Sequence, residues 1–151
     1  MKTTKMKKVL IAMDYDETSQ KVAEVGFSMA QAMHAETILL HVISEQAVYY
    51  SSYTYMLELQ VDVLGDLKKT TQKFLDKTKK HLGAESIQTI LKEGEIAETI
   101  LNTAKEMNAD IIVMGSHSRK WLENIIMGSA AEDVLKTTTI PLFIVPTKKQ
   151  N

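Results

Sequence analysis

The sequence predicts an α/β protein: a single domain with a five-stranded parallel sheet and helices on both faces, the Rossmann-like arrangement. Five short apolar runs recur along its 151 residues. Most of the segments between these runs repeat apolar residues every three or four positions, as amphipathic helices do. Strands that alternate with helices in this way form a parallel sheet with right-handed crossovers.

Length and composition agree with this class. A chain of 151 residues fits one domain, which we place at 1–151. The absence of cysteine excludes disulfides and cysteine-based zinc sites. The net charge of −1 favours neither nucleic acid nor an anionic membrane as a partner. The basic start precedes an apolar run shorter than a signal peptide needs, and no run is long enough to span a membrane. We therefore expect a cytoplasmic protein.

The apolar runs are the five expected strands. They are Val9–Met13, Thr37–Ile43, Ser86–Leu91, Asp110–Met114 and Leu142–Val145. The first and fourth are continuously apolar, which is typical of strands covered on both faces. The third carries polar residues among its isoleucines, so we expect it nearer an edge of the sheet. Pro141 opens the last strand, a position that strands tolerate.

Three of the intervals between strands carry a helical repeat. Its positions are Val22, Val25, Met29 and Met33 in the first, Leu64, Leu67, Thr71, Phe74, Thr78 and Leu82 in the second, and Ile96, Ile100, Ala104 and Met107 in the third. Gly83 stands where the second of these helices would end in a left-handed conformation. A fourth helix is expected to begin at Ser129, because Ser129-Ala130-Ala131-Glu132 matches the S-x-x-E capping box.

Two segments do not fit the alternation. The first, Ser44–Tyr55, is rich in serine and tyrosine and is expected to be a loop, either a lid over a ligand or a surface loop. The second, Gly115–Gly128, joins the fourth strand to the fourth helix over an unusual length. Long loops in compact domains are usually functional, so the second segment is the place to look for a site.

The Gly115–Gly128 segment has the features of a phosphate site. Ligands of parallel sheets bind beyond the carboxyl ends of the strands, and a glycine there lets the backbone come close to them. The helix that begins after Gly128 offers N–H groups and the positive end of its dipole. His117, Arg119 and Lys120 add donors or charge. The alternative is that the glycines serve turns and Ser129 only caps a helix.

The same segment resembles the universal stress protein family, whose ATP-binding members carry G-x-x-G-x(9)-G-[ST] at this point. Here Gly115-x-x-Ser118-x(9)-Gly128-Ser129 matches three of the four motif positions. The likeness extends over essentially the whole chain. The other similar segments are Val9–Asp14, Leu39–Val42, Gly94 at the opening of the third helix, Asp110–Gly115 and Pro141–Val145.

The resemblance implies that the chain binds ATP or a related adenine nucleotide, with Mg²⁺ held largely by water and phosphate oxygens. It implies that Asp14 contacts the adenosine part and that Ala12 and Val42 border the base. Gly115 would approach the ribose and phosphates. The nucleotide-binding residues that we expect are Ala12, Asp14, Val42, Met114, Gly115, His117, Ser118, Arg119, Gly128, Ser129 and Ala130.

Some of these residues have alternative readings. Asp14 and Asp16 stand where a helix begins, and each could act as an N-cap instead of a ligand contact. Ser118 replaces a motif glycine. If that position needs a positive φ, the replacement costs about 1–2 kcal/mol, or about tenfold in affinity.

The resemblance also implies a homodimer that pairs through Leu142–Val145, a short apolar strand of the kind that pairs at a sheet edge. An unidentified protein partner is expected as well. We find no catalytic constellation, and the family implies at most slow ATP hydrolysis or autophosphorylation.

Two other functions stay open. One is a nucleotide-independent interaction or chaperone-like module. The other is an ATP pyrophosphatase of the wider adenine nucleotide α-hydrolase-like group, whose S-G-G-x-[DS] loop is absent from Asp14-Tyr15-Asp16-Glu17.

Overall fold

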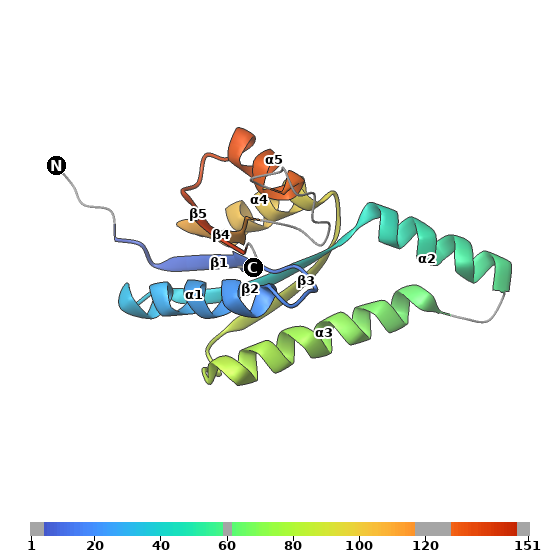
Figure 1. Ribbon diagram of the computed structural model, residues 1–151, viewed down its shortest axis with the longest axis horizontal. Coiled ribbons are helices and arrows are strands. Elements are labelled where there is room, and N and C mark those ends of the chain that lie inside the picture. The colour runs from blue at the N-terminus through green and yellow to red at the C-terminus, as the bar shows by residue number, and fades with distance from the viewer. Residues whose placement is uncertain (1–4, 59–61, 117–127, 148–151) are drawn as a thin grey trace, which may run out of the picture.

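The computed structural model describes residues 5–58, 62–116 and 128–147 (Figure 1). Five parallel strands form one sheet in the order β3-β2-β1-β4-β5. The strands are β1 (Lys8–Ala12), β2 (Glu36–Ser44), β3 (Gln88–Gly94), β4 (Ile111–Gly115) and β5 (Leu142–Val145). The helices are α1 (Ser19–Ala32), α2 (Glu45–Glu58), α3 (Val63–Leu82), α4 (Ile96–Glu106) and α5 (Ser129–Thr137). The predicted α/β fold with a five-stranded parallel sheet is confirmed.

Helices cover both faces of the sheet, because successive side chains of a strand point to opposite faces (Figure 1). Val9 and Ile11 of β1 belong to an apolar cluster with residues of α1 and α3. Leu10, between them, belongs to a second cluster with residues of α4 and α5. The continuous apolar runs in β1 and β4 therefore have the predicted cause, which is burial on both sides.

The edge strands are β3 and β5. β3 lies at an edge, as its mixed composition predicts, but its bounds differ from the prediction. The expected strand begins at Ser86, whereas Ile87 closes a turn by donating its N–H to the carbonyl of Ala84 at 3.2 Å. Pairing with β2 continues instead through the exposed Lys92 and Glu93, whose backbone groups extend the ladder regardless of side-chain polarity.

Both ends of α3 follow local chemistry. Gly83 has φ 75° and donates its N–H to the carbonyls of Lys79 and Lys80, which confirms the predicted left-handed end of α3. At the start of α3, the Asp62 carboxylate accepts from the N–H of Gly65 at 2.9 Å.

The prediction that Ser44–Tyr55 is a loop is wrong, because this segment lies largely within α2. The helix extends beyond the sheet beside α3 (Figure 1). Of residues 45–53, only Ser51 is buried, so this part of α2 has no buried apolar stripe for a periodicity rule to detect. Among the helices in the described part of the chain, none has the length and apolar content needed to cross a membrane.

Candidate functional site

A cleft opens at the carboxyl edge of the sheet, beyond the ends of β1 and β4 and beside the starts of α1 and α5. It has about 560 Å³ of empty volume, its open mouth included. Seven of the predicted site residues line it: Ala12, Asp14, Val42, Met114, Gly115, Gly128 and Ala130. These residues come from β1, β2, β4 and α5, so the fold brings together positions that are far apart in the sequence.

One wall of the cleft is apolar. Ala12, Val42 and Met114 lie on the sheet face that packs against α4 and α5. Ile96 and Ile100 of α4 complete this wall. Val42 and Met114 are buried, so they present little more than their cleft-facing atoms to solvent. Such a wall suits an apolar, planar group.

The acidic end of the cleft is Asp14, two residues beyond the end of β1. Two hydrogen bonds hold the backbone of Met13, the residue before Asp14. The N–H of Met13 donates to the carbonyl of Leu40 at 2.8 Å, and the Met13 carbonyl accepts from His41. A carboxylate placed in this way can accept hydrogen bonds from hydroxyl or amino groups of a ligand.

The capping alternative holds for Asp16 in a modified form: the N-cap of α1 is Thr18, and Asp16 caps the helix from two residues before it. Its Oδ1 accepts from the N–H of Thr18 at 2.9 Å, from the Thr18 hydroxyl at 2.7 Å and from the N–H of Ser19 at 3.1 Å. These bonds satisfy donors at the start of α1. The two neighbouring acidic residues thus have different positions, with Asp16 at the helix end and Asp14 in the lining of the cleft.

The start of α5 differs from the predicted capping box. The N-cap is Gly128, with φ −67° and ψ 156°, and Ser129 is the first helical residue. The S-x-x-E pattern is therefore out of register by one residue, and the prediction that Ser129 caps the helix is wrong. The first N–H groups of a helix have no partner within the helix, and an N-cap side chain usually accepts from one of them. Gly128 has no side chain and so supplies no such acceptor at the start of α5. Gly128, Ala130 and Ala131 line the cleft, and Ser129 is exposed.

Gly115, the last residue of β4, is needed for space and not for a turn. Its φ lies outside the left-handed region. A Cβ there would lie 3.0 Å from Cγ2 of Thr147 and 3.1 Å from Cγ2 of Val22. The missing side chain lets α1 and the segment after β5 approach the end of β4. The reading of this glycine as a turn residue is corrected accordingly.

Two residues next to the cleft carry no motif and were missed by the sequence prediction. Ser116 and Thr147 are buried and hydrogen-bonded to each other across 31 positions of sequence. Single hydroxyl residues at that separation give no periodic or local signal. Only the parallel pairing of β4 with β5 brings them together.

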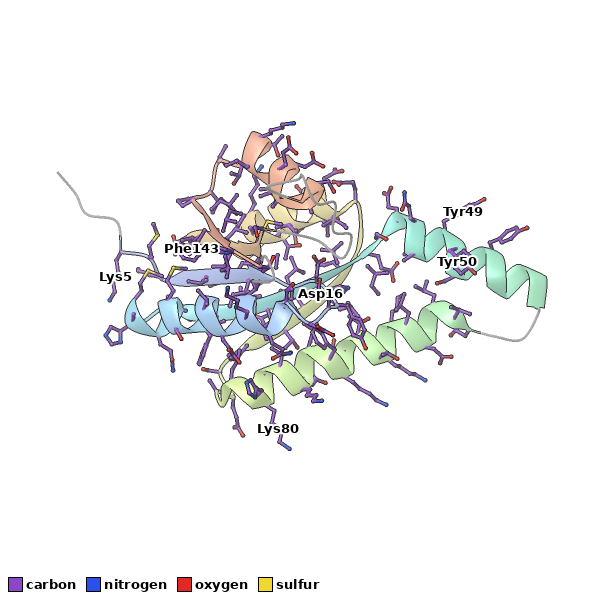
Figure 2. The ribbon with its side chains drawn as sticks, viewed as in Figure 1. Lys5, Asp16, Tyr49, Tyr50, Lys80 and Phe143 are labelled. Atoms are coloured by element: carbon purple, nitrogen blue, oxygen red, sulfur yellow. The ribbon has the colours of Figure 1, made fainter. Side chains whose placement is uncertain are left out.

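Tyr49 and Tyr50 of the tyrosine-rich segment do not cover the cleft. Figure 2 shows Tyr49 and Tyr50 on the part of α2 that extends beyond the sheet, away from Asp16. Tyr49 is 76% exposed and Tyr50 is 68% exposed, and neither lines the cleft. The idea of a lid is therefore not supported for these two residues.

Three predicted site residues, His117, Ser118 and Arg119, lie outside the described residues. The effect of Ser118 in place of a motif glycine stays a prediction. Within the described ranges, no three histidine or acidic side chains gather in a way that could hold a metal ion.

Comparison with known proteins agrees with this architecture. The model of the universal stress protein family matches residues 5–146. Universal stress protein YxiE of Bacillus subtilis is 34% identical over 144 residues, which cover 91% of this chain and 97% of that protein.

Solved structures agree as well. The structure of MJ0577, a universal stress protein of Methanocaldococcus jannaschii, is 28% identical with a TM-score of 0.78, over 97% of this chain and 100% of that one. A universal stress protein solved in complex with cAMP has the same fold, with 19% identity and a TM-score of 0.66, over 96% of this chain and 100% of that one. The family model and the relatives span nearly the whole chain, and the chain belongs to the universal stress protein family.

Proposed function

We propose that the cleft binds ATP or a related adenine nucleotide, and that nucleotide occupancy serves a regulatory role of the protein in the stress response. The observation that carries the proposal is that three kinds of group line one cleft at the carboxyl edge of the sheet. They are an apolar wall for a base, the Asp14 carboxylate for a sugar, and the start of α5, whose N-cap Gly128 has no side chain, for phosphates.

The apolar wall is the proposed base site. Val42 and Met114 present aliphatic and thioether atoms, and Ile100 adds to the same wall. Planar bases gain by burying their faces against such side chains. Asp14 lies beside this wall, where its carboxylate can accept from a ribose hydroxyl.

The start of α5 is the proposed phosphate site. Gly128 and Ala130 line the cleft, and the N–H groups of the first turn have no partner within the helix. N–H groups at a helix start, together with the dipole, favour an anion. Gly115 also lines the cleft, so it lies within reach of the same ligand.

A Mg²⁺ ion would accompany the phosphates. Asp14 is the one carboxylate among the described residues that line the cleft. Mg²⁺ commonly keeps several waters and takes its other ligands from phosphate oxygens. A cleft lined by a single carboxylate suits a Mg²⁺ ion held mainly by water and phosphate oxygens better than an ion held by protein groups alone.

The proposal covers adenine nucleotides as a class. The neighbour in complex with cAMP shares the fold at 19% identity, so the assignment depends on the cleft of this chain and not on that likeness. The competing function is a nucleotide-independent interaction module, which Ser118 favours because it replaces a motif glycine.

A thermal-shift titration with ATP and Mg²⁺ separates the two functions. Ligand at 100 times its dissociation constant adds about 2.7 kcal/mol, or about 5–10 °C for a domain of this size. Gly128→Ala should reduce the shift, because it adds a methyl group to a residue that lines the cleft, while φ −67° suits alanine. Asp133→Ala, on an exposed position of the same helix, is the matched control and should keep it. No shift with ATP, AMP or adenosine would favour the nucleotide-independent module.

The dimer is the second part of the proposal. β5 lies at the edge of the sheet, and Phe143 is 39% exposed on it. An apolar edge strand can pair with a second copy of itself across a two-fold axis. A cytoplasmic location and an unidentified protein partner remain predictions from the sequence.

A further inference from the structure

Two buried hydroxyl residues join the end of β5 to the exit of β4. Ser116 follows β4 directly, and Thr147 lies two residues beyond β5. Ser116 is 8% exposed and Thr147 is 4% exposed. The N–H of Thr147 donates to Oγ of Ser116 at 3.0 Å, and the two hydroxyl oxygens are 3.3 Å apart. Buried polar links of this kind hold their partners firmly, because an unmade hydrogen bond is costly away from water.

The backbone of Ser116 extends the same link in two directions. Its N–H donates to the carbonyl of Val145 at 2.9 Å, and its carbonyl accepts from the N–H of Gly128 at 2.5 Å. One residue therefore connects the end of β5, the exit of β4 and the N-cap of α5. Gly128 is the N-cap, so this bond fixes where the first turn of α5 starts.

Thr147 also packs against Gly115, which lines the cleft. Its Cγ2 lies 3.0 Å from the position that a Cβ of Gly115 would take. The carbonyl of the preceding residue, Pro146, accepts from Nζ of Lys21 at 2.7 Å, which ties this segment to α1. Thr147 thus uses its methyl group on Gly115 and its polar groups on Ser116.

We propose that Ser116 and Thr147 are positioning residues that set the spacing between Gly115 and Gly128, the two glycines at the phosphate end of the cleft. The inference deepens the proposed nucleotide function and depends on it. Neither residue lines the cleft, so both act through the glycines that do. Hydrogen bonds to phosphate oxygens weaken steeply with distance and angle, so a small shift between the two glycines reduces phosphate binding.

The test compares ligands that differ only in their phosphates. Affinities for ATP, AMP and adenosine are measured by calorimetry on the parent, Thr147→Val and Thr147→Ser. Thr147→Val keeps the shape and the N–H bond to Ser116 but loses the hydroxyl contact. We expect it to bind ATP and AMP about tenfold more weakly with unchanged adenosine affinity. Thr147→Ser keeps the hydroxyl and should bind ATP nearly as the parent does.

Thr138→Val is the matched control. The Thr138 hydroxyl forms a similar link at the far end of α5: it donates to the carbonyl of Ile140 at 2.7 Å and accepts its N–H at 3.0 Å. This variant should lower the melting temperature without changing the ratio of ATP to adenosine affinity. A melting curve of each variant without ligand records the folding effect separately.

Two outcomes overturn the inference while leaving the proposed function intact. In one, Thr147→Val binds ATP as tightly as the parent. In the other, it loses affinity for ATP and adenosine equally, which indicates a structural role only. If the parent binds neither ATP nor adenosine, the proposed function fails and the positioning role fails with it.

Discussion

The Nδ1 of His41 lies 2.7 Å from the carbonyl oxygen of Met13. A carbonyl oxygen can only accept, so Nδ1 carries the proton and donates. The N–H of Met13 is bonded in turn to the carbonyl of Leu40. The pairing of β1 with β2 therefore continues one residue past the end of β1 and holds the backbone that leads into Asp14.

Replacing His41 should disturb the adenosine end of the cleft. His41→Leu removes the donor to Met13 and should lower the free energy of unfolding by about 1 kcal/mol, together with adenosine affinity. His41→Asn, whose amide nitrogen can lie near the position of Nδ1, should restore most of both. Urea unfolding and adenosine titration measure the two effects. Equal adenosine affinity in the parent and the leucine variant would contradict the role.

Asp14 and Asp16 should give opposite results. Asp16→Ala removes the acceptor at the start of α1 and should cost about 1 kcal/mol of stability with little effect on nucleotide affinity. Asp14→Asn should weaken adenosine binding, which Asp16→Ala should leave nearly unchanged. Denaturant unfolding and ligand titration of both variants test whether Asp16 serves stability and Asp14 serves ligand binding. Matching losses of affinity in the two variants would be the contrary result.

A side chain at Gly115 should be tolerated only when room is made for it. Gly115→Ala places a methyl group against Thr147 and Val22, and overpacking of this kind costs about 1–3 kcal/mol. Adding Thr147→Ser removes the nearer methyl group and keeps the hydroxyl link. The double variant should recover part of the lost stability, which a double-mutant cycle measures. Strict additivity of the two changes would argue against this contact.

The edge strand should control assembly. Phe143→Lys adds a charge to the exposed side of β5, and we expect monomers by light scattering because like charges would face each other across the two-fold axis. Tyr49→Lys is the control, because it makes a similar change at an exposed position of α2. It should leave the molar mass measured by light scattering the same as that of the parent. A Phe143→Lys variant that stays dimeric would remove β5 from consideration as the interface.

Local patterns in the sequence predict much of this protein because they report burial and chain reversal directly. Val9–Met13 and Ile111–Met114 are apolar throughout, and both strands are covered on two faces. Gly83 has the positive φ that its place after a helical repeat predicts. The search for apolar periodicity does not detect α2, because residues 45–53 bury no apolar side chain against the sheet.

The sequence by itself determined the fold class and the family, and it predicts the edge of the sheet where a ligand would bind. Apolar periodicity and motif spacing are local properties that can be read from the sequence without a structure. Tertiary structure alone decided that Gly128 and not Ser129 caps α5, that Gly115 makes room for Val22 and Thr147, and that Ser116 meets Thr147. These features depend on contacts between segments that are distant in sequence, and such contacts exist only once β4 and β5 pair and α1 packs against them.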